Sequence, residues 1–166
     1  MTNFNEIITK CILQVREECQ FFGALMLFSE VSESNDLETA ATDGKKIYVN
    51  RQFFLGLTSN QQNALLLHEV LHMALLHVHR KSTRDDKTWN IAADIVVNNL
   101  IIENTSYKLP KGAIIDSSYS ENSVEEVYEK ILKNSKNYSL EIPDILDLNK
   151  EGKLFVVHFF TPLFFR

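Results

Sequence analysis

The sequence predicts an α+β domain. Several long stretches repeat apolar residues at helical spacing, and two short segments before residue 51 have the pattern of strands. The chain has 166 residues, of which 45% are apolar and 23% charged, a composition typical of a globular protein. We expect one domain over residues 1–134, followed by a C-terminal tail over 135–166 where the pattern weakens.

The predicted elements before residue 51 are one helix and two strands. Apolar residues at helical spacing predict an amphipathic helix over 4–20. The continuous apolar run 22–31 is closed by Ser and Glu and predicts a buried strand. The polar segment 32–45 contains the turn signal Asp43-Gly44. Alternation over 46–50 then predicts a second strand, which pairs with the first strand or with an edge.

A central helix is predicted next. Its start resembles a capping box, formed by Thr58 with Gln61 or by Ser59 with Gln62. The segment 63–80 contains no Gly or Pro and is apolar over most of its helical surface, so it predicts a helix buried on several sides.

Two more helices follow along the chain. The largely apolar segment 88–102 predicts a third, buried helix. A break at residues 109–112 precedes a short helix over 123–133, with Ser123 as its cap and Glu126 as the capping-box partner.

Composition restricts the classes of partner and location. The net charge of -5 argues against a nucleic-acid binder, which normally carries a basic stripe. Neither a signal peptide nor a membrane-spanning run is recognised, so no membrane association is expected. Cys11 and Cys19 lie on one predicted helix, too far apart along its axis to form a disulfide. Two reduced thiols are typical of a cytoplasmic protein.

The motif His68-Glu69-Val70-Leu71-His72 carries the chemistry. On a helix, the two histidines point within about 40° of each other and lie about 6 Å apart along the axis. Two imidazoles so placed can bind one tetrahedral zinc ion, Zn2+. Glu69 is then placed to act as general base on a water held by the metal. The alternative is a helix without metal, but a buried acid among apolar turns needs compensation, which zinc supplies.

A catalytic zinc needs a third protein ligand. His77 projects about 180° away from His68 if the helix continues, and His79 lies about 10 Å further along the axis than His72. We expect both to be solvent-facing or at the edge of the core. Asp94 is the favoured third ligand, because it is an ionisable residue in an otherwise apolar helix. Its alternative role is a buried hydrogen bond between helices.

Asn90 and Asn98 lie one turn before and one turn after Asp94, on the same helical face. An amide there is suited to orient the far nitrogen of a metal-bound imidazole. For Asn98, this role and a purely structural role are both open.

These residues, together with Thr39–Asn50, His77, Arg80 and Trp89-Asn90, resemble an HExxH metallopeptidase family of bacterial and phage proteins. Its domain often precedes a von Willebrand factor A-like domain. The resemblance covers about residues 4–132, including the segment Ser123–Tyr128. It implies a zincin-like fold, with helices packed on a small mixed β-sheet and a metal site between two buried helices. It also implies that the edge strand Lys46, Ile47, Tyr48, Val49 and Asn50 binds extended substrate.

The sequence therefore predicts a zinc-dependent metallopeptidase acting on a protein or peptide, with His68, His72 and Asp94 as ligands and Glu69 as base. A von Willebrand A-like or ATPase protein is a candidate partner. One alternative is a non-catalytic zinc domain that recruits proteins, which a fourth ligand from His77 or His79 would favour. The other is a metal-free helical interaction module.

Overall fold

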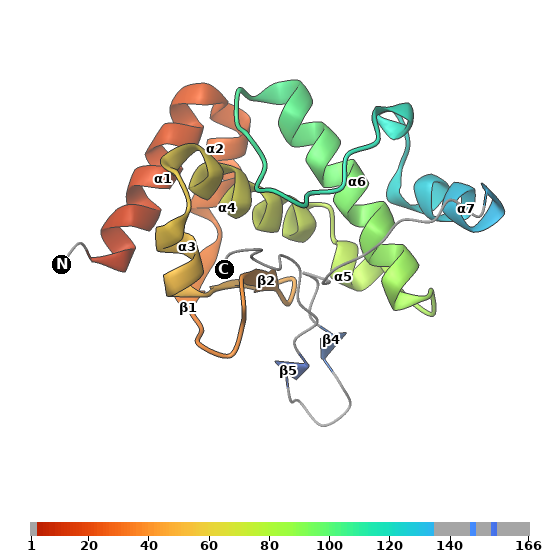
Figure 1. Ribbon diagram of the computed structural model, residues 1–166, viewed down its shortest axis with the longest axis horizontal. Coiled ribbons are helices and arrows are strands. Elements are labelled where there is room, and N and C mark those ends of the chain that lie inside the picture. Colours follow the sequence, from red (N-terminus) through yellow and green to blue (C-terminus); the bar gives the residue numbers. More distant parts are fainter. Residues whose placement is uncertain (1–2, 135–146, 149–153, 156–166) are drawn as a thin grey trace, which may run out of the picture.

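The computed structural model describes residues 3–134, 147–148 and 154–155. The described residues form helices and a small three-stranded sheet, so the predicted α+β class is confirmed. Helix α4 (Ser59–Ala74) lies in the middle of the molecule (Figure 1). It contacts α1 (Phe4–Glu18) and α2 (Gln20–Leu27) on one side and α6 (Asp86–Asn104) on the other.

The prediction of a buried strand over 22–31 is wrong, because residues 20–27 form α2. Phe22 and Met26, one turn apart, are buried, whereas Phe21 is 67% exposed and Leu27 is 61% exposed. The continuous apolar run therefore conceals a helix with one buried face. Gly23 allows α2 to approach α1 closely, since a Cβ atom at this position would lie 2.4 Å from Cα of Arg16.

The sheet contains β1 (Glu30–Glu33), β2 (Ala40–Thr42) and β3 (Lys46–Val49), in the order β1-β3-β2. Strand β3 is parallel to β1 and antiparallel to β2, so the sheet is mixed, as predicted. The strands β2 and β3 are joined by the predicted Asp43-Gly44 turn, where Gly44 has a φ of 85°.

The expectation that residues 46–50 form an edge strand is wrong. Both sides of β3 are paired: its residue Ile47 lies beside Val31 of β1 on one side and beside Thr42 of β2 on the other. The polar segment 32–45, for which only a turn is predicted, also contains β2, whose three residues are all buried. Asn50 lies outside the strand and caps α3 (Arg51–Gly56), where its Oδ1 accepts a hydrogen bond from the backbone of Phe53.

Two predicted capping boxes are confirmed, whereas the helix predicted over 88–102 begins at Asp86 and ends at Asn104. Thr58 and Gln61 form the capping box of α4. Ser123 and Glu126 form the predicted box at the start of α7 (Val124–Asn134), which packs on α6. A short 3-10 helix, η1 (Ser117–Tyr119), lies between α6 and α7 in the chain.

The central helix is shorter than predicted. Helix α4 ends at Ala74, and the backbone of Leu76 adopts the left-handed conformation with a φ of 58°. A separate turn of helix, α5 (His77–Arg80), follows in place of a continuous helix to Arg80. The left-handed residue Leu76 changes the direction of the chain, and with it the positions of His77 and His79.

Most of the predicted tail, 135–166, lies outside the described residues. Within it the structure describes two short antiparallel strands, β4 (Asp147–Leu148) and β5 (Leu154–Phe155). Across the described part of the chain, every helix is too short or too polar to cross a membrane.

Candidate metal centre

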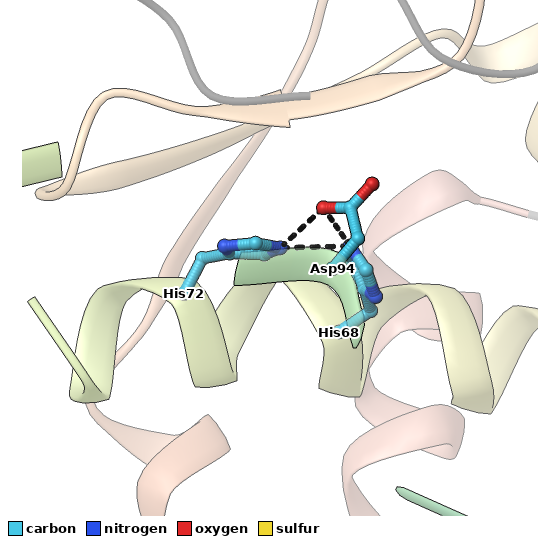
Figure 2. A group of neighbouring side chains, drawn as sticks. All are labelled: His68, His72 and Asp94. Atoms are coloured by element: carbon cyan, nitrogen blue, oxygen red, sulfur yellow. Dashed lines mark hydrogen bonds and ion pairs between the residues drawn. The ribbon is translucent and has the colours of Figure 1, made fainter. Parts of the chain in front are cut away.

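Three metal-ligand side chains converge between α4 and α6. His68 and His72 project from one face of α4, and Asp94 projects toward them from α6 (Figure 2). Nε2 of His72 lies 2.8 Å from Nε2 of His68 and 3.4 Å from Oδ1 of Asp94. Nε2 of His68 lies 3.9 Å from the same carboxylate oxygen. Among the described residues, these three form the group of donors close enough together to hold one ion.

The three side chains of the centre are buried. His68, His72 and Asp94 are 5%, 0% and 4% exposed, so their polar atoms face protein rather than bulk solvent. The close approach of α6 depends on small neighbours, because Ala92 and Ala93 beside Asp94 are fully buried. The short aspartate side chain thereby reaches the imidazoles of the other helix.

Asn98 fixes the orientation of His68. Its Nδ2 donates to the backbone oxygen of Ile114 at 2.9 Å, so its Oδ1 is directed toward Nδ1 of His68, also at 2.9 Å. Because an amide oxygen only accepts, Nδ1 of His68 must carry the proton. The Nε2 lone pair of a neutral His68 therefore points toward His72 and Asp94, which is the tautomer that a metal requires.

Asn90 is buried on α6, one turn before Asp94. Glu69 follows His68 on α4 and is 1% exposed, so the only acid in the motif is buried beside the first histidine.

His77 is placed differently from the prediction of a solvent-facing or core-edge residue. It is fully buried, and its Nδ1 lies 3.0 Å from Nδ1 of His72. The prediction assumed a helix continuing through Leu76, whereas the left-handed backbone there turns His77 back toward α4. Nothing in the sequence marks this turn, because a leucine rarely adopts a positive φ.

His79 remains exposed, as expected, and lies away from the centre. A Cβ atom at Gly44 would lie 3.1 Å from Cε1 of His79, so this ring rests on the turn between β2 and β3.

The five residues predicted to bind substrate serve the sheet and its turns. Ile47 and Val49 are fully buried in the core. Lys46 forms an ion pair with Glu30 at the surface, and Tyr48 donates a hydrogen bond to Asp43. The amide of Asn50 donates to the backbone of Leu37. These contacts give the segment a structural role in the sheet.

The donor set fits a zinc ion. Ligands at about 2.1 Å in a tetrahedron lie about 3.4 Å from one another, a value within the observed range from 2.8 to 3.9 Å. Two imidazole nitrogens and one carboxylate oxygen are a combination found at catalytic zinc sites, where a fourth position is open to water or substrate. The geometry therefore supports a metal centre of hydrolytic type.

Comparison with known proteins places residues 3–143 within the family described as "Putative metallopeptidase domain". A similar protein is an uncharacterized protein of Thermotoga maritima, which is 25% identical over 122 residues. The aligned part covers 69% of this chain and 31% of the relative, so the chain spans about a third of that protein. No solved structure matches the chain.

Proposed function

Because the chain belongs to the "Putative metallopeptidase domain" family, we propose that it is a zinc-dependent peptidase domain with its centre at His68, His72 and Asp94. The observation that supports this most strongly is the convergence of these three donors beside a buried glutamate, with His68 held in the tautomer that a metal ligand needs. The proposed reaction is hydrolysis of a peptide bond in a protein or peptide substrate.

Each residue has a distinct role in this proposal. His68, His72 and Asp94 would hold the ion, which when bound would supply Lewis acidity toward a water molecule and the scissile carbonyl. Glu69 accepts the proton of the attacking water at its carboxylate and passes it to the nitrogen of the leaving amine. Asn98 keeps the Nδ1 proton on His68, so that Nε2 remains a ligand atom throughout.

The positions of the other histidines disfavour a closed, purely structural zinc site. His77 contacts the Nδ1 side of His72, opposite to the side that faces Asp94. His79 lies against the sheet turn at Gly44. Neither of these two candidate fourth ligands therefore reaches the centre, so the donors found among the described residues leave a fourth position for water or substrate.

Further parts of the proposal concern substrate, location and partners. An extended substrate would pair with an outer strand of the sheet, and β2 is the outer strand that contacts α4.

A cytoplasmic location is supported by the free thiols of Cys11 and Cys19. Since the aligned part covers only 31% of the relative, a von Willebrand A-like or ATPase partner is a proposal for the full assembly.

The test compares Glu69→Gln with His72→Ala and with Glu103→Gln, a matched charge removal at an exposed position of α6. Zinc content is measured by atomic emission, and cleavage by mass spectrometry of a mixed peptide library. Glu69→Gln should retain zinc and lose about 10²- to 10⁴-fold in cleavage rate, because the ligands stay and the base is gone. His72→Ala should lose the metal, and Glu103→Gln should match the wild type.

Cleavage by Glu69→Gln at the wild-type rate would show that the assigned base is wrong. A wild-type protein that takes up no zinc from buffered solution would reject the metal centre altogether.

A further inference from the structure

We infer that His77 is a positioning residue for His72, an inference that depends on the proposed metal centre. The two rings are fully buried, with their centroids 5.0 Å apart and their Nδ1 atoms 3.0 Å apart. His72 thus has one ring nitrogen directed to the centre and the other directed to His77. Its partner at Nδ1 controls which nitrogen carries the proton.

The required proton position follows from the geometry. A neutral imidazole carries one proton, so coordination through Nε2 of His72 puts that proton on Nδ1. Nδ1 of His77 must then accept the hydrogen bond, and His77 carries its own proton on Nε2. His77 therefore stabilises the ligand form of His72, as Asn98 does for His68.

An imidazole suits this position because it can also serve the metal-free protein. Nδ1 of His68 donates to Asn98, so Nε2 of His68 can only accept, and Nε2 of His72 lies 2.8 Å away as the donor. Nδ1 of His72 then accepts from Nδ1 of His77. On metal binding, coordination of both Nε2 atoms would replace the hydrogen bond between His68 and His72, and the hydrogen bond between His72 and His77 would reverse its direction, while each ring keeps one proton.

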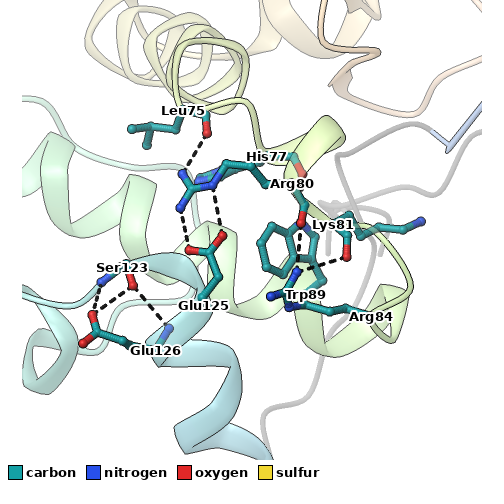
Figure 3. A network of polar contacts seen from close by, with 9 residues as sticks. All are labelled: Leu75, His77, Arg80, Lys81, Arg84, Trp89, Ser123, Glu125 and Glu126. Carbon is teal, nitrogen blue, oxygen red and sulfur yellow. Dashed lines mark hydrogen bonds and ion pairs between the residues drawn. The ribbon is translucent and has the colours of Figure 1, made fainter.

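Several elements hold His77 at this point (Figure 3). The indole nitrogen of Trp89, on α6, donates to the backbone oxygen of His77 at 3.0 Å. Arg80 donates to the backbone oxygen of Leu75, just before the left-handed residue, at 2.9 Å. The same guanidinium contacts both carboxylate oxygens of Glu125 on α7. The reversal of the chain at Leu76 is thereby fixed from α6 and α7 together.

The variants His77→Leu and His77→Gln test the inference, with His79→Leu as the control on the same short helix. Zinc affinity is measured by competition with a chromophoric chelator, and metal-free stability by urea unfolding. His77→Leu should weaken zinc binding about 10- to 100-fold, because a hydrogen-bond partner of a ligand is lost. His77→Gln should recover most of this affinity, since an amide both donates and accepts, and His79→Leu should bind like the wild type.

Wild-type affinity in His77→Leu, or equal losses in the leucine and glutamine variants, would overturn the inference. If His77→Leu does not fold, the inference is tested on the wild type instead. Long-range ¹H–¹⁵N spectra, recorded at a pH where the rings are neutral, show which nitrogen of each histidine carries the proton. Zinc-loaded protein should show protons on Nδ1 of His72 and Nε2 of His77, and metal-free protein the reverse. A proton on Nδ1 of His77 in the loaded protein would refute the assignment.

The outcome is distinguishable from failure of the proposed function. Zinc binding that follows the predicted order of variants, without any cleavage, rejects the peptidase and keeps the role of His77. Cleavage by the wild type, together with unchanged zinc affinity in His77→Leu, keeps the peptidase and rejects the role of His77. Absence of zinc binding in the wild type rejects both.

Discussion

Asn98 accepts a hydrogen bond from the ring of His68 and donates one to the backbone oxygen of Ile114, so Asn98→Ala removes both contacts. Leaving a buried polar group without its partner costs about 1–3 kcal/mol in the free energy of unfolding. The metal-free variant should therefore be less stable by roughly that amount. Its zinc affinity should also fall about 10- to 100-fold, because the ligand tautomer of His68 is no longer selected.

The neighbouring residue provides a matched control. Asn99 is also buried on α6, and its Nδ2 donates to the backbone oxygen of Asp116 at 2.9 Å. Asn99→Ala removes a comparable amide-to-carbonyl hydrogen bond to the same segment, without a contact to either histidine. It should lose a similar amount of stability, about 1–3 kcal/mol, and keep wild-type zinc affinity.

Urea unfolding of the metal-free proteins and chelator competition for zinc measure the two effects separately. The two variants should lose similar amounts of stability but differ in zinc affinity. Unchanged zinc affinity in Asn98→Ala would refute the link between this amide and the metal ligand. So would an equal loss of affinity in Asn99→Ala, which would trace the effect to general destabilisation of α6.

Two further predictions concern the scaffold. Gly23→Ala should lose about 1–3 kcal/mol of stability in urea unfolding, because its Cβ would meet the backbone of Arg16. Gly56→Ala, with open space around it, should stay within about 1 kcal/mol of the wild type, and equal losses would contradict the packing argument. Partial burial raises the pKa of Glu125, but hydrogen bonds and charge from Arg80 outweigh it, so the pKa is lowered overall. This stabilisation is complete above the ordinary pKa of about 4.3 and is lost as pH falls through the lowered value. Between pH 5 and 3, the free energy of unfolding should therefore fall less in Glu125→Gln than in the wild type. Parallel plots of this free energy against pH would reject the coupling between Glu125 and Arg80.

The part of the centre that the sequence predicts is the part governed by regular helix geometry. One turn separates His68 from His72, and one turn separates Asp94 from Asn98, so helical periodicity alone puts each pair on one face. The apolar surfaces of both helices indicate that they pack together inside the domain. The observed convergence of the three donors follows from those two facts.

The features that the sequence does not predict depend on contacts between distant segments. The left-handed backbone at Leu76 lacks the glycine or proline that usually marks a chain reversal, and the contacts that fix it come from Trp89 and Arg80. The buried position of His77 beside His72 was therefore not predicted. Strand β2 has three residues, too few for an alternating pattern, so the pairing of β3 on both sides was missed as well.

The packing of α4 against α6 has a consequence for the abundance of the protein. The proposed ligands come from both helices, so an ion bound between α4 and α6 would cross-link them. The unfolded chain has no such cross-link. Under the proposed function, free zinc at about 100 times its dissociation constant would add about 2.7 kcal/mol to the stability. The fraction of folded protein, and its resistance to proteolysis, would then follow the zinc supply of the cell.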